Sequence, residues 1–88
     1  MDVNAITDFE RELIATVGQA TFPPATGAKR FIRDLKSGHI TQLTENGRWF
    51  LAFIAHRFRR QYALRDDQWI WVNERLKTGR QAPTVKTK

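Results

Sequence analysis

Apolar residues recur every three or four positions along most of the chain, which is the spacing that places side chains on one face of an α-helix. This pattern predicts a first helix over about residues 3–17, which Gly18 is placed to end. It predicts a second helix over residues 28–37, which Thr26 can cap and Gly38 can end. The apolar positions of the two stretches are Val3, Ile6, Phe9, Leu13 and Val17, then Ala28, Phe31, Ile32 and Leu35.

Two further helices are predicted in the second half of the chain. Thr44 can cap a long helix that runs to about residue 62, because nothing between Gly47 and Tyr62 breaks it. Asp66 and Asp67 then stand at the start of a fourth helix, over about residues 66–77. Carboxylates at this position complement the positive end of the helix macrodipole.

These elements predict an all-α fold, a compact bundle of about four short helices in a single domain over residues 1–77. Pro23 and Pro24 forbid helix and favour an extended connector between the first two helices. Residues 78–88 are polar, contain Pro83 and lack a core-forming pattern, so we expect a flexible basic tail there. Apolar residues make up 41% of the 88, which is ample for a globular fold, although a chain this short has a thin core.

The predicted helix 44–62 carries two stripes on nearly opposite sides, because successive helical residues are about 100° apart. One stripe should face the core, and the other should pack under a neighbouring helix or stay available to a partner. In the helix 66–77, Trp71 is expected at the surface or in an interface, or beside Arg75 as a ring under a cation. The core-facing stripe contains Phe50, Leu51, Ile54, Phe58 and Tyr62, and the second stripe contains Trp49, Phe53, His56 and Arg60.

Positive charge is concentrated after residue 27. The chain has 15 Lys and Arg against 9 Asp and Glu, a net charge of +6, to which residues 1–27 contribute −3, residues 28–77 +6 and residues 78–88 +3. This imbalance points to an acidic partner. Arginines beside flat aromatic rings are the combination that single-strand nucleic-acid binders use, and arginine suits forked contacts to phosphate. The simpler alternative is that the arginines form a solvated helix end, which the macrodipole favours.

We therefore expect a small non-catalytic nucleic-acid-binding protein, with the choice between DNA and RNA left open. The alternative is a protein-binding adaptor or inhibitor whose aromatic stripe docks on another protein. A helix-turn-helix reader is disfavoured, because the linker 38–43 is long and the second helix presents bulky aromatic residues. A homodimer is compatible with both hypotheses. The expected phosphate contacts are Arg57, Arg59, Arg60, Lys29, Arg30 and Arg33, and the expected stacking or interface residues are Trp49, Phe53 and Trp71.

No enzyme active site, metal site or cofactor is expected. The absence of cysteine excludes disulfides, thiolate zinc sites and cysteine nucleophiles. His39 and His56 lie on different elements, and Ser37 has no base beside it in the sequence. The longest apolar run, residues 49–55, is too short to span a bilayer, and the N-terminus does not have the pattern of a signal peptide. We therefore expect a cytoplasmic protein without a membrane partner.

A resemblance rests on four short segments, Lys29-Arg30-Phe31-Ile32-Arg33-Asp34-Leu35, Leu43-Thr44, Phe58-Arg59-Arg60-Gln61 and Asp67-Gln68-Trp69. Together they resemble small basic helical proteins of unassigned role encoded on bacterial phages, prophages and plasmids. The resemblance covers about residues 28–77. It implies a bacterial cytoplasmic setting on a mobile element and brings no catalytic or binding residues with it. Such elements encode small proteins that bind nucleic acid and others that block host defence complexes.

Overall fold

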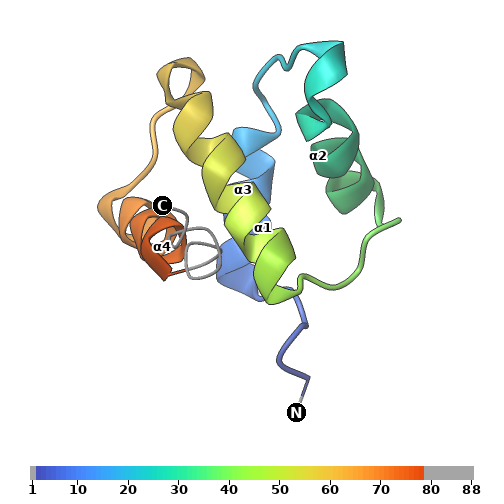
Figure 1. Cartoon of the computed structure of the whole chain (residues 1–88), viewed down its shortest axis with the longest axis vertical. Coiled ribbons are helices and arrows are strands. Elements are labelled where there is room, and N and C mark those ends of the chain that lie inside the picture. The colour runs from blue at the N-terminus through green and yellow to red at the C-terminus, as the bar shows by residue number, and fades with distance from the viewer. Residues whose placement is uncertain (1, 79–88) are drawn as a thin grey trace, which may run out of the picture.

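The structure of the chain, a computed structural model, describes residues 2–78 apart from the side chain of Ala25. The predicted all-α bundle is confirmed. Figure 1 shows α3 crossing the middle of the molecule, with α2 on one side, α4 on the other and α1 behind it. The predicted tail lies outside the described residues except for Thr78, which ends the last helix. The helices are α1 (Asp8–Val17), α2 (Ala28–Ser37), α3 (Glu45–Arg57) and α4 (Asp66–Thr78), with single 3₁₀ turns η1 (Pro24–Thr26) and η2 (Arg59–Gln61).

The first helix begins at residue 8, so the predicted start at residue 3 is wrong. Thr7 caps α1 in a capping box: its Oγ1 accepts from the Glu10 backbone N–H at 3.1 Å, and Glu10 Oε1 accepts from the Thr7 N–H at 3.0 Å. The preceding segment turns at residues 3 and 4, where the Ala5 N–H donates to the Asp2 carbonyl, and it reaches the loop before α3, where the Leu43 N–H donates to the Asn4 carbonyl. Val3, which was expected in the core, is 79% exposed for this reason.

The third helix ends at Arg57, so its predicted end at residue 62 is also wrong. The chain turns at Phe58, makes one 3₁₀ turn and is extended at Tyr62, where φ is −157°. The Tyr62 hydroxyl donates back to the Ala55 carbonyl at 2.9 Å. The sequence has no helix breaker at this end. Contacts with residues that are distant in the sequence hold the turn in place instead.

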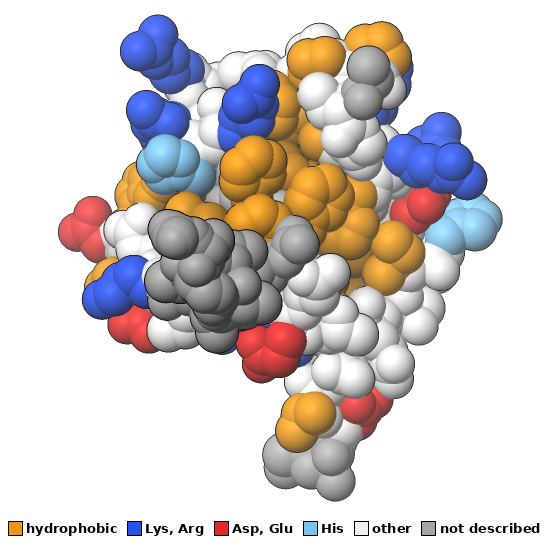
Figure 2. Space-filling model, in the orientation of Figure 1, with side chains coloured by type: hydrophobic (Ala, Val, Ile, Leu, Met, Phe, Trp, Pro, Cys, Tyr) orange, Lys and Arg blue, Asp and Glu red, His pale blue; other side chains and the backbone are white. Residues whose placement is uncertain are grey.

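The core lies where α3 meets the other helices. Leu51 and Ile54 of the predicted core-facing stripe are buried, whereas Phe50, Phe58 and Tyr62 are half-buried. Figure 2 shows that hydrophobic side chains also reach the surface in a band across the middle of this face, with Lys and Arg above and beside them. The buried apolar residues are Ile6, Leu13, Ile14, Val17, Phe22, Ala28, Ile32, Leu35, Leu43, Leu51, Ala52, Ile54, Ala55 and Val72.

Glycines with a positive φ flank α2. Gly38 has a φ of 91° and ends the helix, as its position in the sequence predicts. At the other end, Gly27 has a φ of 79° and takes the N-cap position, one residue after the expected cap. Thr26 still contributes, because its Oγ1 accepts from the Ala28 N–H at 3.2 Å.

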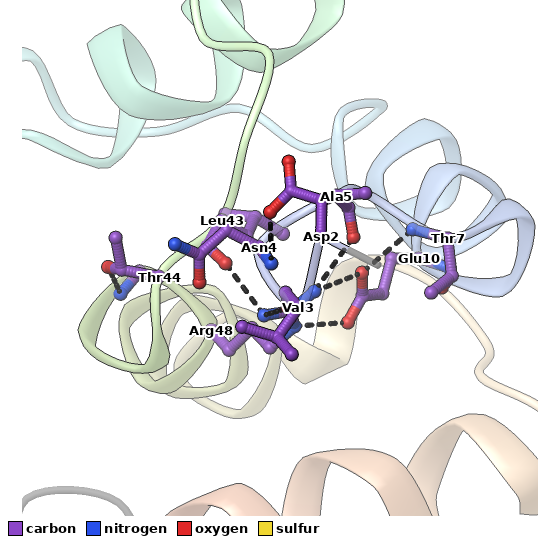
Figure 3. A network of polar contacts seen from close by, with 10 residues as sticks. Asp2, Val3, Asn4, Ala5, Thr7, Glu10, Leu43, Thr44 and Arg48 are labelled. Atoms are coloured by element: carbon purple, nitrogen blue, oxygen red, sulfur yellow. Dashed lines mark hydrogen bonds and ion pairs between the residues drawn. The ribbon is translucent and has the colours of Figure 1, made fainter.

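A buried ion pair ties the N-terminal segment to α3 (Figure 3). Glu10 is 2% exposed and Arg48 is 7% exposed. Arg48 Nε lies 2.6 Å from Glu10 Oε2, and its Nη2 lies 3.2 Å from Oε1. The remaining guanidinium N–H groups donate to the backbone carbonyls of Val3, Ala5 and Leu43, so every donor of this side chain has an acceptor.

The environment of Glu10 favours its charged form. Burial raises the pKa of this carboxyl group, but hydrogen bonds from Arg48 and from the Thr7 backbone outweigh burial and hold the pKa below its ordinary value. The pair therefore stays ionised inside the protein at neutral pH. Since Arg48 is fully occupied here, it is not available to a ligand.

None of the helices in residues 2–78 combines the length and the apolar character needed to cross a bilayer.

Candidate nucleic-acid interface

The first basic cluster lies where α3 ends and η2 follows. Arg57, Arg59 and Arg60 are all exposed, and within residues 2–78 none of the three forms an ion pair. Arg59 Nη1 donates to the His56 carbonyl at 2.9 Å, which satisfies one acceptor at the helix end. The guanidinium carbon of Arg57 lies 5.8 Å from the centre of the Phe58 ring. Three exposed guanidinium groups thus lie within four consecutive positions.

The second basic cluster lies on α2. Lys29, Arg30 and Arg33 are exposed, as the sequence predicts for the side of this helix that faces away from the core. Arg33 Nε lies 3.6 Å from Asp34 Oδ1, which is a loose contact on the surface. Lys29 and Arg30 belong to the first turn of the helix, which contains no acidic residue.

The connector before α2 holds the two basic clusters at the same end of the molecule. The Gln61 side chain pairs with the backbone of Thr21, accepting from its N–H at 2.8 Å and donating to its carbonyl at 3.0 Å. Next to this pair, the Phe22 ring meets the Phe58 ring edge-on, with 4.9 Å between ring centres. Figure 1 shows η2 and the start of α2 at the upper end of the view, and Figure 2 shows Lys and Arg side chains there.

The aromatic residues of the second stripe form a row along α3. Trp49 and Phe53 stack with 5.3 Å between ring centres and 14° between ring planes. Phe53 is 39% exposed and Trp49 is half-buried. Since residues four apart are neighbours on a helix, Arg57 continues this row one turn after Phe53. Arg60 was expected on the same stripe, but it lies in η2 beyond the end of the helix, so that expectation is wrong.

Trp71 is half-buried, and the guanidinium carbon of Arg75 lies 4.8 Å from the centre of its ring. This confirms the alternative in which Arg75 lies over the indole ring. His56 of the second stripe meets Trp69 edge-on at 6.2 Å, so part of this stripe packs against α4. Trp71 lies on α4, away in the sequence from the arginines of the first cluster, and the cation beside its ring is Arg75.

Two acidic side chains are paired with an arginine outside the two basic clusters. Arg65 contacts Asp67 at 3.0 Å and Glu12 at 3.1 Å, which joins α1 to the start of α4. The hydrogen bond from Arg65 lowers the pKa of Asp67 below its ordinary value. Asp66 and Asp67 lie in the first turn of α4, as predicted. Arg65, like Arg48, is thus occupied by acidic partners from its own chain.

The arrangement around Ser37 differs from the expectation that this serine has no base beside it. Ser37 Oγ lies 2.7 Å from His39 Nδ1 and also donates to the Asp34 carbonyl at 3.3 Å. Both side chains are exposed, and no carboxylate in the described part of the chain contacts His39. A nucleophilic triad needs a third group that orients the base.

Across residues 2–78 no group of three or more His, Cys, Asp or Glu side chains could hold a metal ion.

Comparison with known proteins gives no match among family models, curated proteins or solved structures. The resemblance to small proteins of mobile elements therefore stays a prediction.

Proposed function

We propose that this protein is a small non-catalytic nucleic-acid-binding protein, acting in a bacterial cytoplasm, that contacts phosphates through both basic clusters. The main support is the connector, because the pairing of Gln61 with Thr21 anchors η2 beside the chain that leads into α2. Exposed guanidinium groups suit phosphate oxygens because they can donate two parallel hydrogen bonds. The cations assigned to this surface are Arg57, Arg59, Arg60, Lys29, Arg30 and Arg33.

The first turn of α2 separates this proposal from the simpler explanation of a solvated surface. The macrodipole favours anions and disfavours cations at a helix N-terminus. Lys29 and Arg30 nevertheless lie in the first turn, where no acidic residue compensates them. Their position does not serve the stability of the helix, whereas a phosphate bound there gains from both the cations and the helix end. Arg59 also has a structural role, because it donates to the His56 carbonyl at the end of α3.

The test is fluorescence anisotropy with labelled single-stranded DNA, duplex DNA and RNA at several salt concentrations. The first variant replaces Arg57, Arg59 and Arg60 together by alanine. Because these side chains are exposed and form no ion pairs within residues 2–78, the variant is expected to keep its fold and to lose most of its affinity.

The control variant replaces three other exposed cations, Arg11, Arg65 and Lys77, by alanine. It has the same net charge as the first variant, so equal losses in both would mean that only overall charge attracts the ligand. A greater loss in the first variant supports the assigned surface. Binding by the native protein that is weak, equal for all three ligands and absent near physiological salt would contradict the proposal.

The alternative function, a protein-binding adaptor or inhibitor, is favoured by the exposed edge of the Trp49–Phe53 stack. Aromatic side chains near the surface are the residues that dominate many protein interfaces. In that case the salt titrations give only nonspecific binding. A second copy of the chain is another partner for this stack, and a monomer at high concentration in analytical ultracentrifugation would exclude it.

A further inference from the structure

A groove of about 380 Å³ lies between the end of α1 and the outer face of α2. Lys29 and Arg33 of the second basic cluster line it, and so it belongs to the surface discussed above. Two kinds of residues line it. The floor is formed by Gly18, Ala20, Phe22 and Ile32, and the rim by Lys29, Arg33, Lys36 and Ser37.

The cations of the rim form a single row. Lys29, Arg33 and Lys36 follow one another at steps of four and three residues, so they share one face of α2 over roughly 10 Å. Lys36 closes one end of the groove, because its Nζ donates to the Gly18 carbonyl at 3.3 Å. Its side chain lies so close to Gly18 that a Cβ atom there would be 2.7 Å from Lys36 Cδ. Glycine at this position therefore allows Lys36 to reach the end of α1.

The floor of the groove is apolar. Ile32 is 2% exposed, Phe22 is 7% exposed and Ala20 is half-buried, so a ligand resting here would exchange water for aliphatic and aromatic carbon. A simple inorganic anion makes no use of such a floor, and a purely apolar ligand makes no use of the cations. A nucleotide uses both, because its base has an apolar face and its phosphate is an anion. The volume is near the lower end of the range for ligand pockets, roughly 300 to 1,000 Å³, which suits one such unit.

We propose that this groove takes one unpaired base of a single-stranded nucleic acid, with the adjoining phosphates on Lys29, Arg33 and Lys36. This inference rests on the proposed function and deepens it by naming the form of the ligand. In a duplex the bases remain paired and stacked, and none is offered to a groove of this kind. The protein is therefore expected to prefer single strands to duplexes of the same length.

The test is the variant Ala20→Phe, which fills the groove and leaves every charge in place. It should weaken binding of oligothymidylate by about 5- to 150-fold, since stacking of one base is worth about 1–3 kcal/mol. Its affinity for duplex DNA and the salt dependence of its binding should not change, because the phosphate contacts remain. Ala20→Ser, which keeps the groove open, is the control at the same position and should bind as the native protein does.

The outcomes separate this inference from the proposed function. Equal affinity of the native protein for single strands and duplexes, or an equal effect of Ala20→Phe on both, would overturn the groove as a base site and leave the proposed function standing. Absence of salt-dependent binding in the native protein would overturn both. If Ala20→Phe does not fold, NMR titration of the native protein decides: oligothymidylate should shift the amide signals of Gly18, Ala20 and Ser37 more than inorganic phosphate does, and equal shifts would refute the inference.

Discussion

Replacement of Arg48 by methionine is expected to lower the free energy of unfolding by about 3–5 kcal/mol at neutral pH, because it leaves the charge of Glu10 buried without a partner. The structure supports a value in this range. Glu10 is 2% exposed, and two short contacts to the guanidinium group neutralise it. Single domains are stable by only about 5–15 kcal/mol, so the loss is a large part of the total. Urea unfolding followed by far-UV circular dichroism measures it.

The effect of Arg48→Met should depend on pH. In the native protein the pKa of Glu10 is below its ordinary value of 4.5, so the contribution of this carboxylate is complete above pH 4.5 and is lost as pH falls through the lower pKa. In the variant, burial acts without the guanidinium group and raises the pKa of Glu10 above 4.5. Protonation then removes the buried charge, so the difference between native and variant should shrink from pH 7 to pH 4.

Arg65→Met is the matched control, because Arg65 forms ion pairs with Glu12 and Asp67 that are exposed to solvent. It should leave the urea midpoint nearly unchanged. A loss below about 1 kcal/mol in Arg48→Met, or a loss that is the same at pH 7 and pH 4, would refute the reasoning about the buried pair.

Two further predictions concern η2 and the residue that follows it. Gln61→Ala removes both hydrogen bonds to Thr21, so η2 should lose its anchor. Nucleic-acid affinity should then fall in anisotropy titrations, although no charge is removed. Unchanged affinity would show that the anchor has no role in binding. Tyr62 is the only tyrosine, and burial raises its pKa to about 12, so the phenolate absorbance should appear near pH 12 and stability should fall as pH rises from 10 toward 12. A titration midpoint near 10 would contradict the burial of this ring.

The four helices could be predicted from the sequence because their apolar spacing is a local pattern, and tertiary packing does not change which residues share a helix face. Their ends depend on other contacts. The end of α3 is held by Gln61 and Thr21, which are 40 residues apart, and such a contact leaves no trace in a local pattern. The start of α1 could have been predicted, since Thr7 and Glu10 have the spacing of a capping box. The apolar residues before Thr7 also fit the helical period, and this pattern favoured a helix start before the cap.

The candidate site could be predicted only in part, because some of its features also depend on contacts between residues that are distant in the sequence. Arg57, Arg59 and Arg60 are exposed, which follows from a dense run of charge in a small domain. Arg48 belongs to the same half of the chain and looks like another surface cation. Its burial depends on Glu10, 38 residues earlier, and one sequence alone does not show that the two side chains meet. The cationic groove is also not evident from the sequence, because the end of α1, the connector and α2 line it together.

The central claim is that Arg57, Arg59 and Arg60 bind phosphates, and the salt dependence of binding tests it most directly. Each phosphate contact contributes about 0.7 to the slope of log affinity against log salt concentration for a single strand and about 0.9 for a duplex. The triple alanine variant should therefore have a slope that is shallower by about 2 to 3 than that of the native protein. An unchanged slope, or the same decrease in the variant of Arg11, Arg65 and Lys77, would contradict the claim.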